Sequence, residues 1–298
     1  MTDTSEEVRL FRTEAQRHAG SRLRVMPELP VGTYETVTGP VGELMLYRPA
    51  GVEALPGVFV NLHGGGFVLG DWEGDDPYCR FLADAAGCAV INLDYVLAPE
   101  HPYPAAVHQT SDLLAWLAEH GADLGVDASR LAVGGHSAGG NLAAAAALLA
   151  RRRGGPRLRG VVVDYAPLEL SVRPDAKLTG AVRDDPGAVA LAAVGARFDA
   201  WYLPDLRDGA DELASPALAP DLAGLPPTLV ITAENDLLRA EGDRYAGRLR
   251  AAGVETEHAV YPGCGHGFTH DGPQEQAVDA WHRMAAFLRR VLTTKAPA

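Results

Sequence analysis

From Gly57 onward, short apolar runs rich in β-branched residues alternate with longer segments that have a helical hydrophobic period. Five runs predict buried strands: Gly57–Asn61, Cys88–Leu93, Leu131–Gly134, Val161–Tyr165 and Thr228–Thr232. A sixth strand is expected at Thr256–Tyr261. Strands that are apolar on both faces are typical of a parallel sheet covered by helices. The alternation therefore predicts an α/β fold with a mostly parallel central sheet and helices on both faces.

Helices that would cover this sheet are predicted by apolar spacing in the segments between and after the strands. They are Ala105–Glu119, Ala138–Arg151, Glu241–Ala252 and Gln274–Val291. Before the sheet core, Thr33–Val37 and Leu44–Tyr47 flank a Gly39-Pro40 turn signal and predict a hairpin of antiparallel edge strands. The first 30 residues are expected to be helical and peripheral.

A long stretch, Pro167–Leu225, interrupts the alternation and predicts a lid inserted after a core strand. It carries Phe198, Trp201 and Tyr202, which we expect to pack within the lid, with lining of a pocket as the alternative. No repeat of fixed period and no low-complexity linker divides the chain. One domain over residues 1–298 is therefore expected.

The net charge indicates which kinds of partner the protein can bind, and the cysteine content indicates the cellular compartment. The chain has 39 acidic and 26 basic residues, a net charge of −13, which disfavours nucleic acid and anionic membrane surfaces. No apolar run approaches the roughly 18 residues of a membrane span, and the acidic start is unlike a signal peptide. Three cysteines leave at least one thiol free within the chain. We expect a soluble cytoplasmic protein that binds neither nucleic acid nor membrane.

The sharpest local motif is Gly135–Gly139, with the sequence GHSAG, between a predicted strand and a predicted helix. In that position Ser137 would lie on a strained turn with its hydroxyl exposed, as a nucleophile does. Gly135 and Gly139 would let the strand and the helix approach each other. A glycine-rich turn with an incidental serine is the alternative.

A second glycine-rich loop, His63–Phe67, directly follows the first predicted strand. Main-chain N–H groups of Gly65 and Gly66, with that of Ala138, are the candidates for an oxyanion hole. His63 is expected to brace the loop. A phosphate-binding loop is excluded because no glycine run fits either phosphate-loop spacing.

A serine nucleophile needs a histidine base and a carboxylate that orients the base. Asp236 follows the strand Thr228–Thr232, and His266 follows the strand Thr256–Tyr261, in the chain order serine, acid, histidine. We predict a catalytic triad of Ser137, Asp236 and His266.

Other residues could fill these positions. Glu234 is the alternative acid, but it lies closer to the strand end. Three further histidines are expected to be structural or solvated: His258, His270 and His282. Cys264 and His266 make a poor zinc pair without an HExxH motif or a second cysteine pair. No metal and no cofactor are expected.

Several motifs resemble those of the bacterial hormone-sensitive-lipase family (family IV) of α/β-hydrolase carboxylesterases, in the family's order. His63–Phe67 resembles its HGGGF motif, Tyr95–Pro104 its YRLAPE segment and Gly135–Asn141 its GDSAGGN motif. Further similarity is carried by SPALA and LPPT after residue 214, by DLLRAEG from Asp236 and by GHGF from Gly265. The resemblance runs from about residue 30 to the last helix.

This resemblance implies a serine carboxylesterase without metal or organic cofactor that acts on short-chain esters of small molecules. It places Ser137, Asp236 and His266 at the triad positions. Its oxyanion-hole positions fall on Gly65, Gly66 and Ala138. It also implies a cap built from residues of about 1–30 and 167–213, and a possible homodimer.

Three residues depart from the family's motifs. His136 replaces the aspartate or threonine before the nucleophile, Val96 replaces the arginine of YRLAPE, and Leu237 replaces the proline after the acid. The first two suggest a changed loop contact near the elbow, with the His136 side chain turned into packing. The third is expected to loosen the acid loop.

Two other functions remain open at this point. The same scaffold could serve an amidase, a formamidase, a natural-product deacetylase or a dehydratase, because a fold does not fix a substrate. A ligand receptor without catalysis is the alternative of a different class. The complete set of triad residues argues against a receptor.

Overall fold

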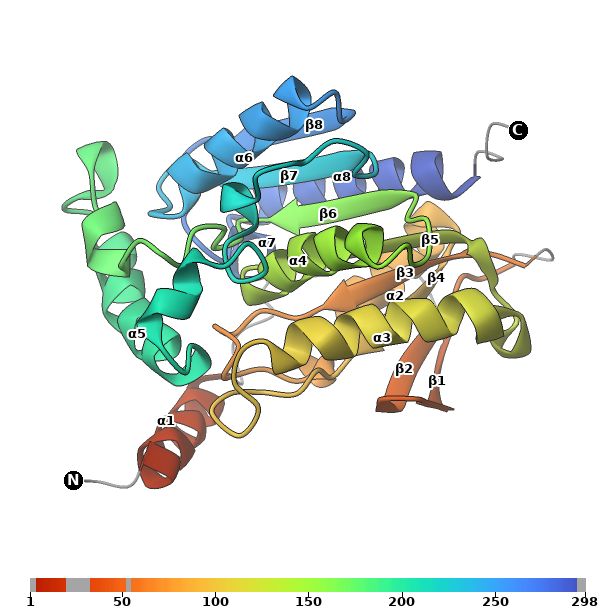
Figure 1. Ribbon diagram of the computed structural model, residues 1–298, viewed down its shortest axis with the longest axis horizontal. Helices are drawn as coiled ribbons and strands as arrows, with labels where there is room; N and C mark the ends of the chain where they lie inside the picture. Colours follow the sequence, from red (N-terminus) through yellow and green to blue (C-terminus); the bar gives the residue numbers. More distant parts are fainter. Residues whose placement is uncertain (1–3, 20–32, 52–54, 294–298) are drawn as a thin grey trace.

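The strands form one eight-stranded sheet in the computed structural model, which describes residues 4–19, 33–51 and 55–293 (Figure 1). They are β1 (Thr33–Gly39), β2 (Gly42–Arg48), β3 (Gly57–Leu62), β4 (Ala89–Leu93), β5 (Asp127–His136), β6 (Gly160–Asp164), β7 (Thr228–Ala233) and β8 (Thr256–Tyr261). Their order in the sheet is β1-β2-β4-β3-β5-β6-β7-β8. Strands β3 to β8 are parallel, and the predicted hairpin β1–β2 adds two antiparallel edge strands beside β4.

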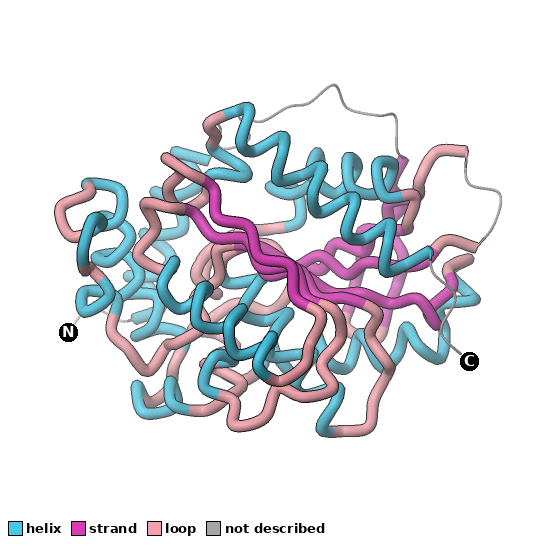
Figure 2. Tube along the Cα trace, turned by 90° about the horizontal axis from the view of Figure 1, so that it is seen from above, coloured by secondary structure: helices cyan, strands magenta, loops and turns pink. Residues whose placement is uncertain are grey.

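Helices cover both faces of this sheet, as Figure 2 shows with the sheet viewed edge-on. The helices are α1 (Thr4–Ala19), α2 (Asp76–Ala86), α3 (Ala105–His120), α4 (Ala138–Arg152), α5 (Pro186–Tyr202), α6 (Arg239–Ala251), α7 (Phe268–Asp271) and α8 (Gln274–Thr293). One core cluster joins the sheet to α3, α4 and α6, and the other joins it to α2 and α8. In β3, Val58 and Val60 belong to the first cluster and Phe59 to the second, because side chains alternate along a strand. The predicted α/β class is confirmed.

Helix α2 lies in a segment where the sequence analysis predicts none. Its apolar positions Tyr78, Phe81 and Leu82 are buried, and the Tyr78 and Phe81 rings contact Trp281 of α8. Pro77 stands in the first turn, where its missing N–H costs no helical hydrogen bond. These features give α2 a buried face that closes one side of the sheet.

The segment predicted as a lid contains a helix, α5, which packs against α1 at the carboxyl ends of the strands (Figure 1). The Phe11 ring lies 5.8 Å from that of Phe198 and 5.3 Å from that of Trp201. Arg197 adds an ion pair to Glu7 at 3.3 Å. The predicted N-terminal helix is thus present at α1, and residues 20–30 lie outside the described residues. In the described ranges, no helix combines the length and the apolar character that a bilayer crossing requires.

Candidate active site

Ser137 is the single residue between the end of β5 and the start of α4. Its φ of 52° and ψ of −121° are strained values for a residue with a side chain. Its N–H donates to the Asp164 carbonyl at 2.8 Å. A Cβ at Gly135 or Gly139 would stand 2.2 or 1.9 Å from the Leu62 carbonyl oxygen, so only glycine fits at either position. The sharp turn lifts the Ser137 side chain out of the sheet.

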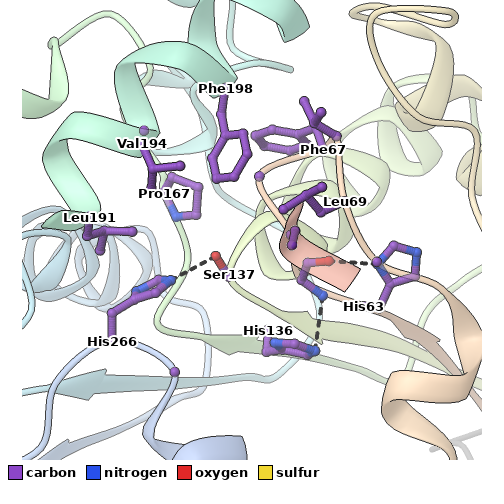
Figure 3. A pocket seen from close by; sticks show the side chains of 18 of the residues that line it. His63, Phe67, Leu69, His136, Ser137, Pro167, Leu191, Val194, Phe198 and His266 are labelled. Carbon is purple, nitrogen blue, oxygen red and sulfur yellow. Dashed lines mark hydrogen bonds between the residues drawn. The ribbon is translucent and has the colours of Figure 1, made fainter. Parts of the chain in front are cut away.

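His266 lies between Ser137 and Asp236, and Figure 3 shows its ring turned toward the serine hydroxyl. The distance from Ser137 Oγ to His266 Nε2 is 3.0 Å, and that from His266 Nδ1 to Asp236 Oδ2 is 2.8 Å. The Nδ1–H donates to the carboxylate, which leaves the Nε2 lone pair to accept the serine proton. Asp236 is buried, and its other oxygen accepts the Leu238 N–H at 2.9 Å. The structure brings the three predicted residues into one relay.

The alternative residues lie elsewhere or face other partners. Glu234 is exposed and accepts the Gly263 N–H at 2.7 Å. His258 faces Asp243 at 3.2 Å, and the His282 ring contacts Phe81. None of these contacts involves the serine.

The glycine loop after β3 presents two backbone N–H groups beside Ser137. Gly65 and Gly66 have φ of 119° and 60°, conformations that favour glycine. A Cβ on Gly65 would lie 2.2 Å from the Leu69 carbonyl oxygen, and one on Gly66 would lie 2.0 Å from the Phe198 ring. Among the described residues, the N–H groups of Gly65 and Gly66 donate no hydrogen bond. Both residues line the cavity.

His63 fixes the start of this loop. Its Nδ1 lies 2.7 Å from the Gly64 carbonyl oxygen, to which it can donate, and its ring stacks on Tyr95 at 4.2 Å. The Tyr95 hydroxyl donates to the His63 carbonyl at 3.0 Å. His63 is buried and lies on the loop side of the cavity (Figure 3). These contacts favour a bracing role.

A cavity of about 880 Å³ opens above Ser137 and His266. Figure 3 shows Leu191, Val194 and Phe198 of α5 forming an apolar wall over the serine. Of the aromatic residues in the lid segment, Phe198 lines the cavity, whereas Trp201 and Tyr202 are buried. The wall offers apolar contact to a ligand.

Leu237, the residue after the acid, packs against the lid segment. It is 4% exposed and shares a small core cluster with Leu238, Val182, Ala188 and Ala192. This packing attaches the acid loop to α5 and to the turn before it.

A polar cluster that no local sequence motif predicts borders Ser137. Asp75 is buried, and its Oδ1 lies 3.0 Å from His136 Nε2 and 3.3 Å from His270 Nε2. The Gly64 N–H donates to His136 Nε2 at 3.0 Å, a contact between the glycine loop and the elbow. The His136 ring thus lines the cavity as well as packing. Asp75 carries no motif, and residues far apart in the chain form this cluster, so only the fold could show it.

The pKa values of His136 and Asp75 are both lowered, but for different reasons. Burial lowers the pKa of His136 to about 4, so the ring is neutral at pH 7. Burial alone would raise the pKa of Asp75, but the contacts with His136 and His270 outweigh it and hold that pKa well below its ordinary value. Asp75 is therefore ionised.

Comparison with known proteins identifies the family. A model of the alpha/beta hydrolase fold matches residues 59–270. The carboxylesterase NlhH of Mycobacterium tuberculosis is 39% identical over 83% of this chain and 77% of its own, and the esterase LipI of that species is 36% identical over 91% and 87%. The chain belongs to the family IV esterases of the α/β-hydrolase fold.

Solved structures of ester-hydrolysing enzymes match nearly the whole chain. The esterase of Pyrobaculum calidifontis has a TM-score of 0.83 and 36% identity and covers 96% of this chain and 94% of its own. An ester hydrolase from the metagenome of Lake Arreo was solved with a bipyridine phosphonate derivative. It has a TM-score of 0.84 and 34% identity, and the match covers 96% of this chain and 91% of its own. As a family IV esterase, the protein is an enzyme of the carboxylic ester hydrolase class.

Proposed function

We propose that the protein is a serine carboxylesterase that cleaves short-chain acyl esters through an acyl-enzyme on Ser137. The relay of Ser137, His266 and Asp236 at the base of an apolar cavity carries this proposal. His266 takes the proton of Ser137 as the hydroxyl attacks the ester carbonyl. Asp236 orients the ring and stabilises its positive charge.

The oxyanion forms opposite the glycine loop. In this proposal the N–H groups of Gly65, Gly66 and Ala138 receive the negative charge, since rigid backbone donors need no rearrangement as the charge develops. The positive φ of Gly65 and Gly66 supports the role of the loop. His266 then protonates the leaving alkoxide, and a water activated by the same ring releases the carboxylic acid.

The N-terminal helix and the inserted segment act as the cap in this proposal, over residues of about 1–30 and 167–213. Support comes from the contact of Phe11 on α1 with Phe198 on α5, both of which line the cavity. Phe198 also lies against Gly66, so it covers the oxyanion side of the site. The cap would bound the acyl and alcohol pockets and favour short chains.

A cytoplasmic location is a second part of this proposal. The three cysteines are free and buried, which supports a cytoplasmic location. The family resemblance also implies a homodimer, and this prediction can be checked by analytical sedimentation.

The decisive assay is hydrolysis of p-nitrophenyl esters from acetate to dodecanoate, with N-formyl substrates in parallel. We expect turnover that is highest at short acyl chains and that Ser137→Ala abolishes. Turnover of N-formyl substrates alone would favour an amidase on the same scaffold.

A further inference from the structure

Two imidazoles and one carboxylate converge at the floor of the cavity. They are His136 at the end of β5, His270 in α7 and Asp75, which directly precedes α2. Both Nε2 atoms approach the same oxygen, Asp75 Oδ1, at 3.0 and 3.3 Å. The two rings stack with 4.0 Å between their centroids. One donor atom from each residue lies within 4.8 Å of the other two.

The outer atoms of the cluster are held by neighbouring side chains. The Asn61 amide donates to Asp75 Oδ2 at 2.7 Å, which leaves Oδ1 to face the imidazoles. The Tyr165 hydroxyl lies 3.2 Å from Nδ1 of both His136 and His270. Such outer contacts orient the ligands of a metal ion and fix the tautomer of a ligating histidine.

A metal ion requires the tautomer that places a lone pair on each Nε2 atom. The Thr269 hydroxyl lies 2.8 Å from the Tyr165 hydroxyl, 3.0 Å from Asp164 Oδ2 and 3.1 Å from His270 Nδ1. In the required tautomer both Nδ1–H groups donate to the Tyr165 oxygen, and the Tyr165 hydroxyl donates to Thr269. Consistent with this tautomer, His136 Nε2 accepts the Gly64 N–H.

In this tautomer the two unprotonated Nε2 atoms lie 3.0 and 3.3 Å from the Oδ1 atom of Asp75. Within the described part of the chain, His270 Nε2 is buried and makes no hydrogen bond. Without an ion, an Nε2–H group can donate to Asp75, and a cation bound among the three atoms would displace such a proton.

The donor set suits zinc. Zinc binds neutral imidazole nitrogens and carboxylate oxygens at about 2.0–2.2 Å, which in a tetrahedral site separates neighbouring ligand atoms by about 3.3 Å. The two N–O distances in the cluster, 3.0 and 3.3 Å, lie close to that value. All three residues line the cavity, which provides an entry path and room for water at the fourth position.

We propose that Asp75, His136 and His270 form a binding site for a divalent transition-metal ion, with zinc as the best match. The site is distinct from the serine relay, and the proposed ester hydrolysis does not use it. A bound ion would compete with the Gly64 N–H for His136 Nε2 and so displace the glycine loop. Zinc should therefore inhibit hydrolysis.

The test is zinc titration of metal-stripped full-length protein by calorimetry, with wild type and three variants. Wild type should bind one zinc ion, and His270→Ala should weaken that binding at least about 100-fold. His266→Ala should bind as wild type does, because the ion does not use the catalytic imidazole. His258→Ala is the matched control, since His258 also faces a carboxylate, that of Asp243 at 3.2 Å.

Cobalt absorption keeps the test independent of enzyme activity and of stability differences between variants. Wild type should show the visible bands of a tetrahedral Co²⁺ site, and folded His270→Ala, checked by circular dichroism, should lack them. Absence of zinc and cobalt binding by wild type would overturn the proposal and assign the Nε2 protons to ordinary hydrogen bonds with Asp75. Binding that His266→Ala loses and His270→Ala keeps would also overturn it, because the ion would belong to the relay.

Discussion

Two groups of imidazole and carboxylate border Ser137 and differ in how many rings share the acid. In the first, Asp236 faces one ring, and the free nitrogen of His266 lies 3.0 Å from the serine oxygen. In the second, Asp75 faces two rings, and both nitrogens turn inward to the same carboxylate oxygen. The same residue types therefore serve proton transfer in the first group, where one ring links the acid to the hydroxyl. In the second group the two rings share the acid and contact no serine hydroxyl.

Replacing each of the two carboxylates by an amide should give the largest difference in kcat between the two groups. Asp236→Asn should lower kcat by about 10⁴-fold, because an amide no longer fixes the useful tautomer of His266. Asp75→Asn should lower kcat by less than about tenfold, because Asp75 does not contact the relay. Steady-state kinetics on p-nitrophenyl butyrate would measure both. Equal losses in the two variants would contradict the assignment.

The glycine loop joins the two groups, since Gly64 contacts His136 and the next glycines face the cavity. Gly65→Ala should lower kcat by about 10²- to 10³-fold, the usual effect of losing an oxyanion donor, because the new Cβ would meet the Leu69 carbonyl at 2.2 Å. The matched control is Gly247→Ala in α6, where a Cβ meets nothing within 4 Å. That variant should keep its kcat and gain about 0.5–1 kcal/mol in unfolding free energy. Wild-type activity in Gly65→Ala would refute the loop's role.

The relay was accessible to sequence reasoning, and the second group was not. Ser137, Asp236 and His266 follow strands that local apolar patterns reveal, and parallel strands bring their carboxyl ends to one edge. Asp75 carries no comparable signal, and His270 follows the motif that identifies His266. Their meeting depends on the packing of α7 and α2, a tertiary outcome that no local pattern encodes.

Some elements of the fold could likewise be predicted from local sequence, and others could not. All predicted strands are present. The central strands β3, β4, β6 and β7 are buried along their whole length, and such continuous apolar runs have few alternative structures. Helix α5 was not predicted inside the lid segment. Its apolar residues do not segregate to one face, because alanine and valine recur along the whole helix, and Val189 is exposed while Leu191 and Val194 line the cavity. A helix that is apolar on every side gives a weak periodic signal.

A carboxylate in the cavity wall provides a contrast with Asp75. Asp199 of α5 has no imidazole neighbour among its charged contacts, and burial raises its pKa to about 6 despite the opposing charges of Lys177 and Arg173. The folded state then binds more protons than the unfolded state between about pH 4 and 6, so unfolding free energy falls as pH rises through this window. Asp199→Asn should remove that fall and be more stable than wild type at pH 7 by up to about 3 kcal/mol.

Denaturant titrations at pH 4 and pH 7 would check this, with exposed Asp112→Asn as control. Asp112 pairs with Arg153 at the surface, so its variant should stay within about 0.5 kcal/mol of wild type at both pH values. A stability gap for Asp199→Asn that is the same at both pH values would contradict the assigned pKa.

The smallest effect on turnover is expected for His136→Asp, which restores the residue type that the family usually has before its nucleophile. Activity should stay within roughly tenfold of wild type, because His136 contacts the loop and Asp75 rather than the serine hydroxyl. kcat and KM measured across pH would test this. A loss as large as that of Ser137→Ala would show that His136 belongs to the catalytic machinery.

The central claim is that Ser137 is the nucleophile, and covalent labelling by a fluorophosphonate tests it most directly. Peptide mass spectrometry of the labelled wild-type protein should find one phosphonate adduct, on the peptide that contains Ser137, and Ser137→Ala should carry none. An active protein whose adduct lies on another residue, or that resists labelling while it turns over esters, would contradict the account.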